Sequence, residues 1–330
     1  MLSKEETIRL QTTLEALPDA LELILYKTED NEFGRQLESF VNTICRTSEG
    51  KIRALQASPE AGLPASPCFR ICHGERRNIA YAAVPEEHQF APFLKALESF
   101  SRNTSLSLKT SSELAQIIPP VEIWVLVSSQ CPRCPSVVKA AVTLSSQCPS
   151  ASLFIIDAQQ FPNLTGERGI KAVPATVIDR QLVLIGDIST NRLVELVRIR
   201  GTDQFDEELM RSFIERGRIG QAAEQLRQGK GRTTVLSLVQ ELDMSARMSG
   251  LVVLDKALEN DPAAVREMVP SLIELLSHQD SRIRGDIADI LSKVGDQRAI
   301  PPLERLAGDL DVDVAEAAAE ALELIRGQQT

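Results

Sequence analysis

Apolar residues in the stretch 119–200 form short runs typical of buried strands, separated by segments in which they recur every three or four residues, as in amphipathic helices. The runs predict four strands, at 121–127, 153–157, 173–178 and 182–186. Helical spacing predicts a helix that starts near Pro135 and a closing helix at 191–197. The third strand opens at a proline, Pro174.

The first hundred residues show a similar order of elements. After a helix at 3–17, the pattern predicts a strand, a helix, three strands and a helix, at 21–26, 31–45, 52–55, 66–71, 79–82 and 90–100. The second of the three strands again opens at a proline, Pro67. The two stretches therefore look like two copies of one α/β unit.

Residues 201–330 read as helices only, and their end repeats with a period of about 31 residues. Matching positions include Val269 with Ile300, Pro270 with Pro301, Leu272 with Leu303, Asp280 with Asp311 and Leu291 with Leu322. This pattern resembles HEAT-like repeats, in which pairs of antiparallel helices stack. A weaker copy is predicted at 235–260.

The strongest candidate for a reactive site is Cys131-Pro132-Arg133-Cys134, which lies between the strand at 121–127 and the helix that follows. A Cys-x-x-Cys at such a turn indicates a thioredoxin-like redox motif. Free N–H groups at the helix start favour a thiolate at Cys131, and Arg133 adds a positive charge. The thiolate is the attacking species in disulfide exchange.

Val173-Pro174 supports this interpretation, because thioredoxin-like folds place a cis-proline at the start of a strand beside the cysteine pair. Cis peptide bonds occur almost only before proline. Two alternatives stay open. The pair could be half of a zinc site, although the sequence has no second Cys-x-x-Cys or His-x₃₋₅-His, or it could be structural, without chemistry.

Composition narrows the class of protein. The chain has 330 residues, 43% of them hydrophobic, which is ordinary for a globular protein of two or three domains. No stretch approaches the ~18 apolar residues of a membrane span. The charged start Met1–Glu6 lacks the apolar core of a signal peptide, so we expect a cytoplasmic protein. The net charge of −10, concentrated after residue 200, argues against nucleic-acid binding there.

Several motifs of the first 200 residues resemble one family. They are Pro67–Ile71, Ala82–Pro85, His88–Phe90, Ser112–Ala115, Cys131–Val138 and Gly169–Ala175. Together they resemble the N-terminal domain of the F subunit of alkyl hydroperoxide reductase and, more distantly, the protein disulfide oxidoreductases of thermophiles. The resemblance implies tandem thioredoxin-like folds, followed here by an all-α HEAT-like domain. We expect domains at 1–118 (lacking the cysteine pair, with Glu29-Asp30-Asn31 in its place), 119–200 and 201–330.

The resemblance implies a dithiol relay that takes electrons from a flavin-dependent reductase and passes them to a peroxiredoxin. This chain departs from the family in lacking Gly-x-Gly-x-x-Gly, and hence a flavin or nicotinamide module of its own. Gln89 stands where the family has a glutamate thought to assist the redox cysteine, and a glutamine cannot accept a proton. Pro132 and Arg133 between the cysteines are closer to the Cys-Pro-x-Cys of glutaredoxins.

The function predicted is thiol–disulfide exchange in which Cys131 attacks a client disulfide and Cys134 resolves the mixed disulfide. Pro174 would shape the groove for the client chain, and its neighbours Val173 and Ala175 would offer backbone groups to that chain. No metal or bound cofactor is required. An external reductase would supply electrons, and the HEAT-like surface would hold a protein partner. The alternative is a redox-sensing adaptor in which the cysteine pair is a switch; a passive scaffold is a third, weaker option.

Overall fold

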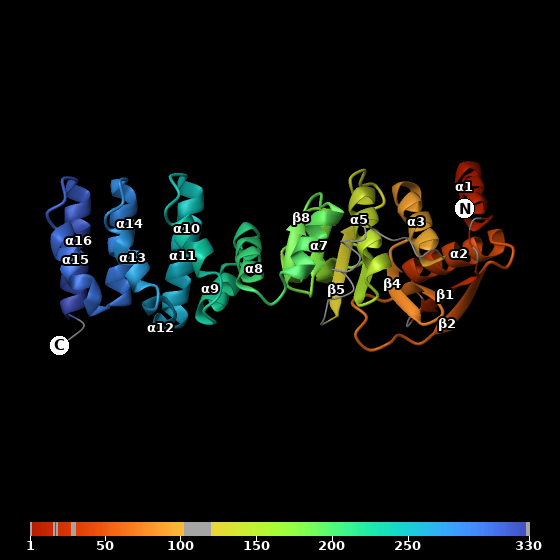
Figure 1. Cartoon of the computed structure of the whole chain (residues 1–330), viewed down its shortest axis with the longest axis horizontal. Helices are drawn as coiled ribbons and strands as arrows, with labels where there is room; N and C mark the ends of the chain where they lie inside the picture. The colour runs from red at the N-terminus through yellow and green to blue at the C-terminus, as the bar shows by residue number, and fades with distance from the viewer. Residues whose placement is uncertain (1, 16, 18, 28–30, 102–119, 328–330) are drawn as a thin grey trace. The chain divides into compact units, whose positions relative to one another are not determined.

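The structure, a computed structural model, describes residues 2–15, 17, 19–27, 31–101 and 120–327 (Figure 1). The chain divides into two compact units, residues 1–200 and 201–330. Each unit has its own hydrophobic core and is described by itself below.

The first unit is built on a single sheet of eight strands, in the order β2-β1-β3-β4-β6-β5-β7-β8. The strands are β1 (Leu21–Tyr26), β2 (Ile52–Ala57), β3 (Cys68–His73), β4 (Arg76–Ala82), β5 (Val121–Val127), β6 (Ala151–Asp157), β7 (Ala175–Ile178) and β8 (Leu182–Ile185). The central β5 and β6 are parallel and almost entirely buried, as their continuous apolar runs indicate.

Helices cover both faces of this sheet. They are α1 (Lys4–Glu15), α2 (Glu32–Thr47), α3 (Phe90–Ser101), α5 (Cys134–Gln147), α6 (Pro162–Arg168) and α7 (Thr190–Arg198), with a short 3₁₀ helix, η1 (Glu87–Gln89). One face carries α2 and the contacting helices α1, α3, α5 and α7. The other face, which includes Trp124, packs against Leu63 of the 58–67 loop and Leu164 of α6.

The two halves of the first unit are joined through β4 and β6, which pair in parallel with Ile79 opposite Leu153. Asn78, buried beside this junction, donates hydrogen bonds from Nδ2 to the carbonyl oxygens of Ser145 and Ala151, at 2.7 and 2.9 Å. Buried polar groups need such partners, so Asn78 ties β4 to the connection between α5 and β6.

The second unit consists of helices, most of them paired. They are α8 (Asp203–Glu215), α9 (Ile219–Arg227), α10 (Arg232–Leu238), α11 (Met244–Asn260), α12 (Pro262–Arg266), α13 (Val269–Leu275), α14 (Ser281–Val294), α15 (Ile300–Leu306) and α16 (Val312–Gly327), with the 3₁₀ turn η2 (Gln297–Ala299). Alanine, leucine and isoleucine side chains from these helices form one continuous core.

Arginine–aspartate pairs join successive repeats of this unit. Arg247 of α11, almost fully buried, donates to Asp286 of α14 at 2.9 Å. Arg284, four positions after the capping Asp280 as Arg247 follows Asp243, donates to both carboxylate oxygens of Asp309 at 2.8 and 2.7 Å. The same position in two repeats therefore makes the same kind of contact to the next repeat.

The predicted fold class is confirmed: an α/β half on thioredoxin-like units is followed by a helical half. The predicted order of strands and helices around each proline also matches the structure. Three of the predictions fall outside the described residues. They concern the boundary at 118/119, the linking helix near Ser112–Ala115, and Glu29 and Asp30. Among the residues that are described, no helix is long and apolar enough to cross a lipid bilayer.

Candidate active site

The cysteine pair lies at the turn between β5 and α5, and the two sulfurs form a disulfide, with Cα atoms 5.5 Å apart. Cys131 is half-buried, whereas Cys134, the first residue of α5, is fully buried. The backbone N–H of Cys134 points at Cys131 Sγ, 3.1 Å away. This N–H is one of the unpaired donors of a helix start, so it stabilises negative charge on that sulfur.

Val173 and Pro174 lie beside this turn, although they are about 40 residues away in sequence. The Val173 carbonyl oxygen is 3.9 Å from Cys131 Sγ, and the Val173–Pro174 peptide bond is cis. The Pro174 carbonyl accepts a hydrogen bond from the N–H of Gly186 at 2.8 Å, which fixes the loop against the end of β8. The structure thus brings both predicted groove residues to the cysteine pair.

Arg133 is anchored by a residue that the sequence analysis did not identify. Its guanidinium donates to one carboxylate oxygen of Asp187, from Nε at 3.0 Å and from Nη2 at 2.6 Å. These bonds raise the pKa of Arg133. Because Asp187 supplies a countercharge, Arg133 presents much less positive charge to Cys131 than an unpaired arginine would. Pro132 is exposed next to it.

The other four cysteines are thiols outside any disulfide. Cys68, Cys72 and Cys148 are buried, and Cys45 is half-buried in α2. Burial raises the pKa of Cys68 to about 12 and that of Cys72 to about 11. Thiols with such pKa values are almost entirely protonated near neutral pH and react slowly. Within the described part of the chain, no cluster of three or more histidine, cysteine or acidic side chains could hold a metal ion.

Gln89 lies in η1, which packs against α5. Its side chain is only 2% exposed, and within the described residues neither Oε1 nor Nε2 has a hydrogen-bond partner. His88, its neighbour, is exposed. The amide is therefore buried without a hydrogen-bond partner among the described residues.

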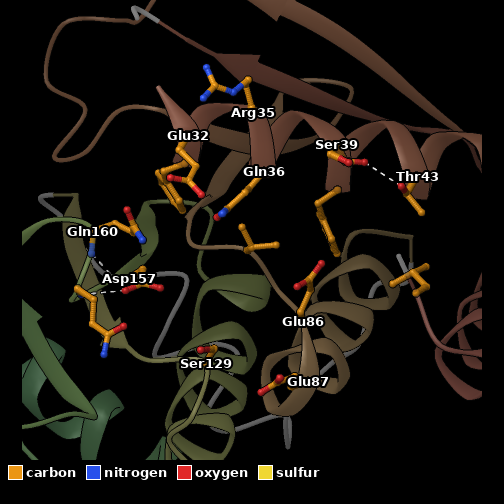
Figure 2. Close-up of a pocket in the computed structure, with 15 residues that line it drawn as sticks. Glu32, Arg35, Gln36, Ser39, Thr43, Glu86, Glu87, Ser129, Asp157 and Gln160 are labelled. Atoms are coloured by element: carbon orange, nitrogen blue, oxygen red, sulfur yellow. Dashed lines mark hydrogen bonds between the residues drawn. The ribbon is translucent and has the colours of Figure 1, made fainter. Parts of the chain in front are cut away.

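A cavity of about 640 Å³ opens next to the redox turn, and no sequence pattern indicated it. It is lined by α2, by the 84–87 loop, by Ser129, two residues before Cys131, and by the end of β6. Figure 2 shows Glu32, Glu86 and Asp157 facing it from three different elements. Only assembly of the tertiary structure places these elements around one space, which is why no local sequence signal could reveal it.

Comparison with known proteins agrees with this geometry. The thioredoxin domain family matches residues 121–198. A thioredoxin of Methanocaldococcus jannaschii is 31% identical over 81 residues, which are 24% of this chain and 95% of that protein. The chain belongs to the thioredoxin family. HEAT repeats match residues 235–323.

A longer match extends over both halves of the first unit. The F subunit of alkyl hydroperoxide reductase of Staphylococcus epidermidis is 26% identical over 183 residues, 55% of this chain and 34% of that protein. This thioredoxin-family chain therefore spans about a third of the length of that relative. The predicted resemblance is confirmed.

Solved structures share the fold. The F subunit of the Enterococcus faecalis alkyl hydroperoxide reductase, as a C503A mutant, aligns with a TM-score of 0.55 at 20% identity, over 59% of this chain and 99% of that one. A protein disulfide oxidoreductase from Aeropyrum pernix aligns with a TM-score of 0.53 at 16% identity, over 60% and 93%. At such identities the likeness concerns the fold alone. Membership of the thioredoxin family supports a thiol–disulfide redox function in general.

Proposed function

We propose that this protein is a thiol–disulfide oxidoreductase that relays electrons to a protein client through Cys131 and Cys134. The observation that carries the proposal is the asymmetry of the pair. Cys131 is partly exposed to solvent and lies next to the Val173 carbonyl. Cys134, in contrast, is fully buried. An exposed sulfur can attack a protein disulfide, and a buried neighbour can resolve the product.

The reaction proceeds in two exchanges. The Cys131 thiolate attacks one sulfur of the client disulfide, which forms a bond from Cys131 to the client and releases the other client sulfur as a thiolate. The Cys134 thiolate then attacks Cys131 Sγ, which forms the Cys131–Cys134 disulfide and releases the second client thiolate. Two electrons have moved to the client, and an external flavin-dependent reductase must supply two more to reduce the Cys131–Cys134 disulfide again.

The neighbouring residues position the client. The edge at Val173 and Pro174 offers backbone groups to an extended chain that approaches Cys131, and the Cys134 N–H stabilises the attacking and leaving thiolate at Cys131. Arg133, held by Asp187, fixes the turn. A peroxiredoxin is the client that the resemblance favours. A cytoplasmic location is part of the proposal, because a reducing compartment keeps such a pair cycling.

Mutation of each cysteine separately tests this function. With dithiothreitol as the reductant, Cys131→Ser should lower the rate of insulin reduction to that of dithiothreitol alone, whereas Cys45→Ser should leave the catalysed rate unchanged. Cys134→Ser should accumulate a mixed disulfide with the client, visible as a band that disappears on reduction. Undiminished turnover by Cys131→Ser would refute the assignment.

The HEAT repeats at 235–323 favour a second candidate, a redox-sensing adaptor. In that case the helical unit holds a protein partner and the Cys131–Cys134 pair only reports the redox state. The two candidates differ in turnover. Catalytic insulin reduction supports the oxidoreductase, and partner capture that requires the oxidised pair, without turnover, supports the adaptor.

A further inference from the structure

The helical unit carries an apolar stripe that its own core does not use. Met244, Met248 and Val252 of α11 are 67%, 42% and 41% exposed, and Leu242 just before the helix is 63% exposed. Their spacing of four residues places the three helical side chains on one face of α11. Exposed methionines and aliphatic side chains gathered in this way indicate a contact surface for another molecule.

Two contacts define how α11 lies against α14. Arg247 of α11 forms an ion pair with Asp286 of α14, and Asp255 of α11 forms one with Lys293 of α14. Residue numbers therefore increase in the same direction along both helices. The helices therefore run parallel, and positions counted from their capping aspartates, Asp243 and Asp280, lie roughly side by side. The third helix, α16, packs on α14 in the next repeat (Figure 1).

This alignment gives rows of exposed positions across the three helices. The fifth residues after the caps Asp243, Asp280 and Asp311 are Met248, Gly285 and Glu316, and the ninth residues are Val252, Asp289 and Glu320. Gly285 has open space above its Cα, with no atom within 4 Å of a built Cβ. In these two rows the face thus changes from apolar on α11, past the small Gly285 on α14, to acidic on α16, whereas the first residues after the caps on α11 and α16, Met244 and Val312, are both exposed and apolar.

Charge on this face is unbalanced at one end only. Lys293 is neutralised by Asp255 and Asp289, at 2.9 and 2.7 Å. Glu316 and Glu320 of α16 are exposed, and within the described residues neither makes an ion pair. Unpaired carboxylates next to an apolar stripe suit a partner that carries both apolar and basic side chains, and they repel anionic surfaces.

We infer that α11, α14 and α16 form a docking surface for an extended basic segment of a partner protein. Apolar side chains of that segment would pack on Met248 and Val252, and its arginines or lysines would pair with Glu316 and Glu320. Helices packed about 9 Å apart place α11 and α16 about 18 Å from each other. An extended chain covers that distance in about six residues. The inference rests on the proposal that the helical unit holds a protein partner, and it specifies the chemistry of that partner.

Fluorescence anisotropy with a labelled synthetic peptide tests this surface on the full-length chain. The probe has a leucine cluster and an arginine cluster separated by about six residues, and the control probe has glutamates in place of the arginines. We expect saturable binding of the first probe only, weakened by added salt. The pair Met248→Ser with Val252→Ser and the pair Glu316→Gln with Glu320→Gln should each weaken it about tenfold.

Glu215→Gln, which removes an exposed acid from α8, is the matched control and should leave binding unchanged, and far-UV circular dichroism verifies that each variant is folded. Equal binding of both probes, or insensitivity to both pairs of substitutions, overturns the inference. Self-association that is lost in Met248→Ser with Val252→Ser overturns it too, because a second copy would then be the occupant. Insulin reduction measured on the same samples separates the two proposals: normal turnover without peptide binding refutes this surface alone.

Discussion

The guanidinium of Arg133 and the carboxylate of Asp187 form a two-bonded ion pair, at 3.0 and 2.6 Å, directly beside the redox disulfide. The arginine sits inside the Cys-x-x-Cys, and the aspartate follows β8, 54 positions later in the chain. The charge that an isolated motif would present to Cys131 is therefore partly cancelled by a residue far away in sequence.

Removing Asp187 and removing Arg133 should change the reactivity of reduced Cys131 in opposite directions. Asp187→Asn leaves Arg133 without a countercharge and should increase the thiolate fraction of Cys131 about twofold, the size expected for one charge near the surface. Arg133→Gln should decrease it. The measurement is the rate of iodoacetamide alkylation of Cys131 at several pH values. The double variant should fall between the two, and identical rates in all proteins would contradict the prediction.

The buried thiols of Cys68 and Cys72 should not react with alkylating reagents until the first unit unfolds. Burial raises the pKa of Cys68 to about 12, well above the range where alkylation is fast. With the disulfide intact, brief treatment with iodoacetamide at pH 8 should label Cys45 slowly and leave Cys68 and Cys72 unlabelled. Mass spectrometry of tryptic peptides measures this. Rapid labelling of Cys68 in the folded protein would show that the site is open to solvent.

The same burial makes the first unit less stable in alkali. A thiol whose pKa is raised on folding stabilises the fold fully below its unfolded pKa of about 8.5, and that stabilisation is lost as the pH rises toward the folded value. For Cys68 the loss should reach about 2 kcal/mol by pH 10. Urea unfolding followed by fluorescence of Trp124, the single and buried tryptophan, measures it. Cys68→Ala lacks the titrating group, so its stability should fall less between pH 8 and pH 10.

Much of this architecture could be predicted from the sequence, because the signals were local. The apolar run at 121–127, the cysteines at the following turn and the proline before 175–178 each depend on neighbours a few residues away. What could not be predicted depends on contacts between distant segments. The pairing of β4 with β6, the partner Asp187 and the cavity beside Ser129 all join residues that are far apart in the chain.

The ion pair between Arg247, which is almost fully buried, and the half-buried Asp286 should contribute measurably to the stability of the helical unit. Arg247→Ala leaves Asp286 without its partner and removes a packed side chain, which should cost about 2–3 kcal/mol. Thermal unfolding followed by circular dichroism at 222 nm measures the helical transition. Lys256→Ala, on the same helix but in an exposed pair with Glu259, should have little effect. Equal losses in the two variants would argue against a special role for Arg247.

Gln89 offers a test of what its site tolerates, because its amide is 2% exposed and, within the described residues, has no hydrogen-bond partner. Gln89→Glu would place a carboxyl group in the same site, where burial disfavours the charged form. The folded protein would then hold a proton that the unfolded chain releases above about pH 4.3. Stability relative to the wild type should therefore be nearly unchanged at pH 4 and should fall by roughly 1–3 kcal/mol by pH 8.

Two further substitutions make this comparison decisive. Gln89→Met removes the unsatisfied polar atoms at similar volume, so it should be neutral or stabilising at every pH. Gln181→Glu, at an exposed position of the turn between β7 and β8, adds the same charge in water and should show no such pH dependence. Urea unfolding at pH 4, 6 and 8, followed by Trp124 fluorescence, measures all three. If Gln89→Glu were as stable as the wild type at pH 8, a positive group or water must reach the site, and the prediction would be wrong.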